Sequence, residues 1–271
     1  MSAAARWADA LAAWAIPQDI LDAAPEPPWH FPPALFRLAA EVALGEDEPT
    51  NPSRRAALEA LPPGGSVLDV GAGGGAASLA LCPPAVQLTA VDQSPAMLEA
   101  FAAGAEKRGV SHREVQGSWP DVAGEVGAAG VEVADVVVCH NVAYNVADLA
   151  PFAAALTDHA RGRVVLELNA QHPMVALNHA WLALHGVERP TTPTAADAIA
   201  VLEETGLTVR SEEFERRSLF DHLERRDLVA FARRRLCVGP ERDAEIDALL
   251  LPDHDAPLRH FVTVWWRGSA S

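Results

Sequence analysis

The sequence is nearly free of lysine. Lys107 is its single lysine, and 21 lysine and arginine residues stand against 37 aspartate and glutamate residues, which gives a formal net charge of −16 at pH 7. A field of this sign repels phosphate backbones, and nucleic-acid affinity depends heavily on neutralising phosphates. The composition therefore disfavours a DNA or RNA substrate.

Cysteine is also scarce, and long apolar runs are missing. Cys82, Cys139 and Cys237 are odd in number and have no CxxC spacing, which predicts buried thiols in a reducing compartment rather than disulfides or a metal site. No stretch reaches the roughly 18 uncharged apolar residues of a membrane helix. The N-terminus lacks the basic and compact apolar regions of a signal peptide. These absences predict a cytoplasmic protein without a membrane partner.

What the sequence does contain is an alternation of short apolar runs and helical segments. The expected strands cover 67–70, 88–92, 112–116, 134–139, 163–168, 207–214 and 261–267. The expected helices cover 34–43, 53–61, 76–81, 96–107, 149–159, 174–185, 194–205 and two segments between 219 and 251 that are broken at Gly239-Pro240. This alternation predicts a mostly parallel sheet with helices packed on it.

Proline and helix patterns divide the chain into three segments. Residues 1–60 are helical and interrupted by proline, and we expect them to form an N-terminal helical cap. Residues 61–215 hold the alternating pattern and form the expected core. Residues 216–271 add inserted helices and a closing strand to the same domain.

A glycine-rich turn follows the first expected strand. Gly71 and Gly73 allow positive φ and close approach of backbone N–H groups to a ligand, and with Ala76 they also fit the dinucleotide pattern G-x-G-x-x-G/A. Asp69 stands two residues before Gly71, where an acid suits a cationic cofactor better than an anionic pyrophosphate. Asp92 follows 21 residues after Gly71, at the end of the second expected strand, where it can accept both ribose hydroxyls of an adenosine.

These segments resemble a known family. Residues 67–75, Val-Leu-Asp-Val-Gly-Ala-Gly-Gly-Gly, are similar to motif I of the class I S-adenosylmethionine-dependent methyltransferases. Residues 90–98 resemble the ribose-binding segment of that family, and residues 138–144 and 162–167 resemble its fourth-strand exit and fifth strand. The resemblance implies a Rossmann-like, seven-stranded, mostly parallel α/β sheet with an antiparallel last strand. It also implies S-adenosylmethionine as cofactor and S-adenosylhomocysteine as product.

The resemblance also implies roles for single residues. Asp92 would hold the ribose, Gln93 or Met97 would flank the adenine, and Asn141 would support the methionine end. Ser118 stands where the family commonly has an acid, so the adenine contact loses charge assistance. The expected cofactor-binding set is Asp69, Gly71, Ala72, Gly73, Gly75, Asp92, Gln93, Met97, Ser118, Trp119, Asn141 and Arg54. Two of these have an equally simple alternative, because Trp119 fits a core aromatic and Arg54 fits a helix-surface charge.

Three side chains near the ends of the fourth and fifth strands are the candidates for catalysis. Ligands bind outside the carboxyl ends of strands in such sheets, which places His140, Tyr144 and His172 around one crevice. A base is needed only if the acceptor must lose a proton. His140 could equally line the pocket, and His172 could be a loop histidine bonded to backbone. The aromatic segment Trp29-His30-Phe31 could cover the acceptor or join two helices.

The expected function is transfer of a methyl group, by in-line displacement, to a small-molecule acceptor. Alternatives are methylation of a protein or RNA and a catalytically silent cofactor-binding partner subunit. An NAD-dependent oxidoreductase is the remaining alternative, since the glycine turn alone fits both cofactors. Tight binding of NAD without binding of S-adenosylmethionine would select that last one.

Overall fold

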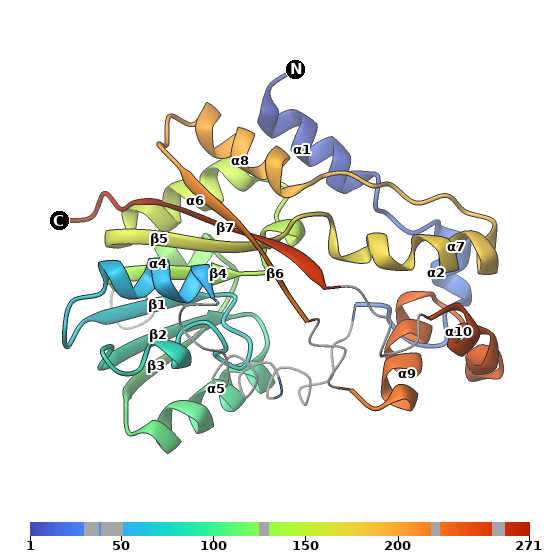
Figure 1. Cartoon of the computed structure of the whole chain (residues 1–271), viewed down its shortest axis with the longest axis horizontal. Coiled ribbons are helices and arrows are strands. Elements are labelled where there is room, and N and C mark those ends of the chain that lie inside the picture. The colour runs from blue at the N-terminus through green and yellow to red at the C-terminus, as the bar shows by residue number, and fades with distance from the viewer. Residues whose placement is uncertain (30–37, 39–50, 125–129, 218–222, 251–257) are drawn as a thin grey trace.

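The computed structural model describes residues 1–29, 38, 51–124, 130–217, 223–250 and 258–271. Within these residues the centre is a seven-stranded sheet in the order β3-β2-β1-β4-β5-β7-β6 (Figure 1). The strands are β1 (Ser66–Val70), β2 (Gln87–Asp92), β3 (Ser111–Gln116), β4 (Ala134–His140), β5 (Ala160–Asn169), β6 (Arg210–Arg216) and β7 (Arg259–Arg267). β1 to β5 pair in parallel, and β7 lies antiparallel between β5 and β6. The expected sheet, with its antiparallel last strand, is confirmed.

The strand order reverses beside β1, which pairs with β2 on one side and β4 on the other. Chain connections leave in opposite directions from such a point, so a crevice opens outside the carboxyl ends of the strands there. The glycine turn, the end of β2 and the end of β4 all lie at this edge of the sheet.

Helices cover both faces of the sheet (Figure 1). They are α1 (Ala3–Ala12), α2 (Gln18–Ala23), α4 (Pro52–Ala60), α5 (Pro95–Arg108), α6 (Leu149–Asp158), α7 (Asn178–His185), α8 (Ala195–Glu204), α9 (Arg225–Arg235) and α10 (Asp243–Leu249). α1, α6 and α8 share one core with the sheet, in which Trp7 is fully buried. α4 and α5 share the core of the opposite face around Phe101. Residues of α7, α9 and α10 bury a separate apolar cluster at one side of the molecule (Figure 1).

The helix expected over 76–81 is wrong. That segment is a series of turns, and only Leu79–Leu81 forms a 3-10 helix. Ser78 donates its hydroxyl to Asp69 (2.6 Å), and Pro83 and Pro84 follow soon afterwards, where proline cannot continue a helix. The crossover from β1 to β2 therefore has no α-helix.

Other expectations on the helices are largely confirmed. Pro95 opens α5 at its first position, although the Ser94 side chain makes no capping hydrogen bond. The expected helix 174–185 begins as a 3-10 segment, Pro173–Leu177, and continues as α7. The break at Gly239-Pro240 separates α9 from α10. The sixth strand begins at Arg210 rather than at 207. The helix expected over 34–43 lies outside the described residues.

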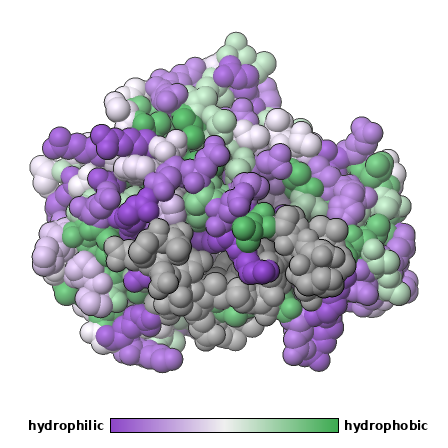
Figure 2. All heavy atoms as spheres, viewed as in Figure 1, coloured by the Kyte–Doolittle hydropathy of each residue, from purple (hydrophilic) through white to green (hydrophobic). Residues whose placement is uncertain are grey.

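The surface of the described part mixes polar and apolar side chains. Figure 2 shows the apolar groups on one face as separate small patches among hydrophilic residues. Among the described residues, no helix is both long and apolar enough to cross a bilayer.

Candidate functional site

The glycine turn after β1 has a backbone that favours glycine. Gly71, Gly73 and Gly75 have φ of +71°, +52° and +83°, a region that other residues rarely adopt. A Cβ on Gly71 would lie 2.3 Å from Cγ2 of Val142, so the turn packs directly against the segment that follows β4. The glycine turn and the residues that follow β4 are therefore packed in direct contact.

Asp92 holds this turn in place. One carboxylate oxygen accepts a hydrogen bond from the Gly73 N–H and the other accepts one from the Ser94 N–H, both at 2.9 Å. The side chain stays partly exposed at the end of β2, and each carboxylate oxygen can accept a further bond. The predicted proximity of the glycine turn and Asp92 is confirmed.

Asp69 lies beneath the turn rather than on its surface. It is 1% exposed, and its carboxylate accepts the Ser78 hydroxyl at 2.6 Å. Burial raises the pKa of Asp69 to about 7, while hydrogen bonds from Ser78 oppose that rise. Asp69 therefore stabilises the turn from its buried side, through Ser78. The predicted contact with a cationic cofactor stays a prediction.

The residues expected around the adenine lie at the ends of β2 and β3. The Gln93 amide donates to the Ser118 hydroxyl at 3.0 Å, so these two predicted residues meet. Met97 is buried on α5. Trp119 is 9% exposed and belongs to the core, where its indole N–H donates to the Phe152 carbonyl at 3.4 Å. Its position matches the core-aromatic alternative.

Polar side chains gather where β4 and β5 end. His140 Nδ1 lies 3.9 Å from Oε2 of Glu167, which is 1% exposed on the neighbouring strand. Asn141 has φ of +60°, its N–H donates to the Glu167 carbonyl (2.8 Å), and its Oδ1 accepts the Asn169 amide (3.0 Å). Arg216 of β6 donates to Oε1 of Glu167 at 2.6 Å. Residues of β4 and β6 thus lie beside one buried carboxylate of β5.

This cluster has unequal charge states. Burial would raise the pKa of Glu167, but Arg216, His140 and a hydrogen bond from Ser53 together hold it below its usual range. Burial lowers the pKa of His140, with Arg216 adding to the effect and Glu167 opposing it. The carboxylate is therefore ionised and the imidazole neutral near pH 7.

Tyr144 and His172 lie together, but in an aromatic cluster. The Tyr144 hydroxyl donates to the Asn169 carbonyl at 2.7 Å, and burial raises the pKa of this phenol. Its ring stacks on Trp7 at 5.6 Å and meets the edge of His172 at 5.2 Å. His172 stacks on Trp14 at 3.9 Å and accepts the Met174 N–H at 3.3 Å. These contacts dock the N-terminal segment onto the sheet and match the backbone-bonded alternative for His172.

Two further residues that the sequence singles out are Arg54 and Trp29. Arg54 is half-buried on α4, and its backbone N–H donates to the Asn51 side chain at 2.9 Å. Trp29 is 57% exposed and lies 5.6 Å from the Arg235 guanidinium. His30 and Phe31 lie outside the described residues.

The sequence also held two members of the site that we did not predict, Glu167 and Arg216. A carboxylate within the apolar run 164–168 is the signal that marks Glu167, since such a group is rarely buried without a partner. Nothing in the neighbouring residues marks Arg216 as that partner.

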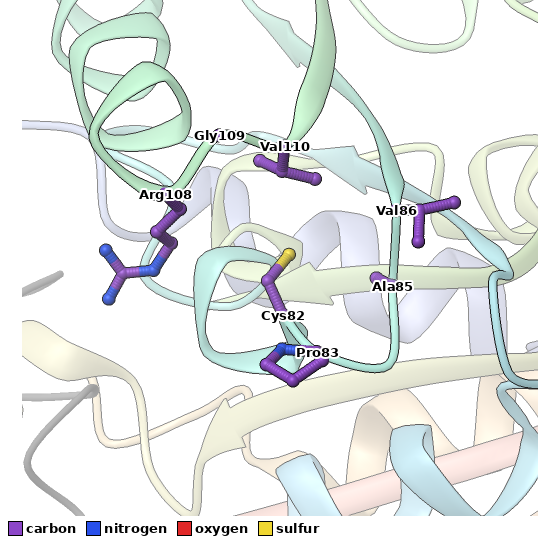
Figure 3. Close-up of a pocket in the computed structure, with 7 residues that line it drawn as sticks. All are labelled: Cys82, Pro83, Ala85, Val86, Arg108, Gly109 and Val110. Atoms are coloured by element: carbon purple, nitrogen blue, oxygen red, sulfur yellow. The ribbon is translucent and has the colours of Figure 1, made fainter.

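A cavity elsewhere is not part of this crevice. It has a volume of about 460 Å³ and is lined by residues that precede β2 and β3, namely Cys82, Pro83, Ala85, Val86, Arg108, Gly109 and Val110 (Figure 3). Those residues lie at the amino ends of the strands, opposite the glycine turn. Among the described residues no cluster of histidine, cysteine or acidic side chains suits a metal ion.

Known proteins share this architecture. Residues 68–166 match a family model described as a methyltransferase domain. A comparison with curated proteins gave no match.

Solved structures match over most of the chain. The YcgJ protein from Bacillus subtilis is 16% identical, with 85% of this chain and 100% of that chain covered and a TM-score of 0.55. A putative methyltransferase from Bacillus halodurans C-125 is 20% identical, with 79% and 96% covered and a TM-score of 0.54. Magnesium protoporphyrin IX methyltransferase from Synechocystis PCC 6803, with bound S-adenosylhomocysteine, is 13% identical, with 87% and 84% covered and a TM-score of 0.50. At these identities the likeness concerns the fold.

Proposed function

We propose that this chain is a class I methyltransferase that transfers a methyl group from S-adenosylmethionine to a small molecule. Residues 68–166 match a methyltransferase domain, and a putative methyltransferase shares the fold. The observation that carries the proposal is the hydrogen bond from the Gly73 N–H to the Asp92 carboxylate. It lies at the point where the strand order reverses. An acid at this place faces the crevice in which the fold binds its ligands.

The donor set fits an adenosine with a cationic tail. Asp92 offers carboxylate oxygens to ribose hydroxyls, and the Gln93–Ser118 pair offers an amide and a hydroxyl to the edge of an adenine. Asn141 and Asn169 offer side-chain amides where the amino-acid end would lie. S-adenosylmethionine supplies a methyl group already activated on a sulfonium, so the chain chiefly has to align the acceptor with it. Alignment of this kind is worth about 7–11 kcal/mol.

The charge of the protein supports a small-molecule acceptor. The net charge of −16 repels nucleic acid. The charge therefore favours a small-molecule acceptor over a nucleic acid.

Calorimetric titration tests the cofactor. We expect S-adenosylmethionine and S-adenosylhomocysteine to bind and NAD to show no heat of binding. Asp92→Asn should weaken S-adenosylhomocysteine by about ten-fold or more, because a charge-assisted hydrogen bond contributes about 1.5–3 kcal/mol. Asp121→Asn, which alters an exposed acid after β3, is the matched control and should bind as the wild type does. Binding of NAD alone would overturn the proposal.

A further inference from the structure

Asn141 has a backbone conformation that its neighbours must hold in place. Its φ of +60° lies in the left-handed region, which residues other than glycine adopt at a cost. Its N–H donates to the Glu167 carbonyl at 2.8 Å, and its Oδ1 accepts a hydrogen bond from the Asn169 amide at 3.0 Å. Backbone strain of this kind gathers at functional sites, so the placement of Asn141 calls for an explanation.

The position of Asn141 allows it to meet a ligand. The residue is exposed and directly follows the carboxyl end of β4. The next residue, Val142, packs against Gly71 of the glycine turn, and β1 lies between β2 and β4 in the sheet. A ligand that crosses the end of β1 with its ribose on Asp92 therefore has its other end beside Asn141.

The carboxylate of Glu167 fixes the direction of the Asn141 amide. The Asn141 Nδ2 donates to Oε1 of Glu167 at 3.4 Å, and Arg216 of β6 donates to the same oxygen at 2.6 Å. An ionised carboxylate only accepts hydrogen bonds, so it binds the NH2 group of the amide and turns the amide oxygen away. That oxygen accepts one hydrogen bond from Asn169 and keeps a second lone pair for a ligand.

Arg216 keeps the carboxylate of Glu167 ionised. The acid is 1% exposed, and a buried acid takes up a proton unless a positive group is close. Burial would raise the pKa of Glu167, and Arg216 is the strongest of the influences that hold it below its usual range. A protonated Glu167 could donate to the Asn141 oxygen, and the amide would then lose its preferred direction. A residue of the edge strand β6 thus controls an amide at the end of β4.

We propose that Glu167 and Arg216 are positioning residues for the amino-acid end of S-adenosylmethionine, and that through Asn141 they hold an amide oxygen toward its ammonium group. The inference rests on the proposed function. An ammonium group carries three N–H donors and no acceptor, so it requires an oxygen at this place rather than an NH2 group. Because Glu167 is buried and acts through Asn141, the contacts to the ribose and the adenine do not depend on it.

Two nucleosides separate the amino-acid end from the rest of the cofactor. S-adenosylhomocysteine carries the ammonium group, whereas 5′-methylthioadenosine has the same adenosine and thioether sulfur without the amino acid. Calorimetric titration measures the dissociation constant of each. Glu167→Gln should weaken S-adenosylhomocysteine about ten-fold and leave methylthioadenosine within about two-fold, because glutamine offers Asn141 both an NH2 group and an oxygen. Equal losses for the two nucleosides, or no loss for either, would overturn the inference.

Asn141→Gly tests whether the effect passes through the amide. Glycine adopts a positive φ without strain, so this variant should fold, and it should also weaken S-adenosylhomocysteine about ten-fold. Adding Glu167→Gln to it should cause no further loss, since residues that act through one contact are not additive. Additive losses would contradict the inference.

Two substitutions on β6 serve as controls. Arg216→Lys, which keeps the positive charge, should retain S-adenosylhomocysteine affinity within about three-fold. Glu212→Gln alters an acid of the same strand that pairs with Arg55 at the surface, and it should bind both nucleosides as the wild type does. The double variant Glu167→Gln/Arg216→Gln leaves no unpaired charge behind and should show the same selective loss even if the single variant Glu167→Gln is unstable.

The outcomes distinguish this inference from the proposed function. If neither nucleoside binds the wild type, the proposed function itself fails. If both bind and the selective loss is absent from Glu167→Gln or the double variant, only the role of Glu167 and Arg216 fails.

Discussion

Replacing Asp69 by asparagine should reduce the dependence of stability on pH. Burial raises the pKa of this carboxyl from 3.8 to about 7, a rise of about three pH units at about 1.4 kcal/mol each. Since the pKa is higher in the folded than in the unfolded state, the protonated form stabilises the fold below pH 3.8. That stability is lost as the pH rises through about 7, and the loss amounts to about 4 kcal/mol.

The measurement compares free energies of unfolding in denaturant between pH 4 and pH 8. Asparagine can still accept a hydrogen bond from the Ser78 hydroxyl. The free energy of unfolding of Asp69→Asn should therefore rise relative to that of the wild type as the pH rises, by up to about 4 kcal/mol. Glu106→Gln, which alters an exposed acid on α5, is the control and should stay parallel to the wild type. A constant gap between Asp69→Asn and the wild type across this range would refute the reasoning.

Three further substitutions test other parts of the account. Trp7→Ala removes a fully buried indole and should cost about 3–5 kcal/mol of unfolding free energy; unchanged stability would mean that α1 is not docked as described. Burial lowers the pKa of His172 to about 4, so the wild type should lose stability as the pH falls from 6.5 to 4, by about 1–2 kcal/mol after allowance for solvent screening. His172→Phe should remove that loss, and equal acid sensitivity would count against it. Gly71→Ala places a Cβ 2.3 Å from Val142 at a φ of +71° and should weaken both stability and S-adenosylhomocysteine affinity. Gly109→Ala, whose Cβ meets open space at a φ of +63°, should cost only about 1 kcal/mol; similar binding losses in both variants would contradict the role of the turn.

The sheet could be predicted because its signals are local. Short apolar runs separated by helical segments leave few alternatives to a parallel sheet, and each expected strand is present within a few residues of its predicted limits. The prediction of a helix over 76–81 was wrong because interactions with distant residues decide the conformation of this segment. Alanine-rich residues there favour a helix, but the bond from Ser78 to Asp69 and the short path to β2 impose turns.

The residues of the site likewise divide into those that local patterns could predict and those that they could not. Gly71, Asp92 and His140 could be placed together because each ends or follows a strand at the same edge of the sheet. The pair of Glu167 and Arg216 could not be predicted, since its members are 49 residues apart and only the register of β5, β7 and β6 joins them. Long-range packing likewise placed Tyr144 and His172 against tryptophans of the N-terminal segment.

A crystal structure of the complex with S-adenosylhomocysteine tests the central claim most directly. We predict that the ribose hydroxyls bond to Asp92 above the glycine turn and that the sulfur lies on the side of His140. A nucleoside bound elsewhere, such as in the cavity beside Arg108, or a sulfur directed away from the end of β4, would contradict the account.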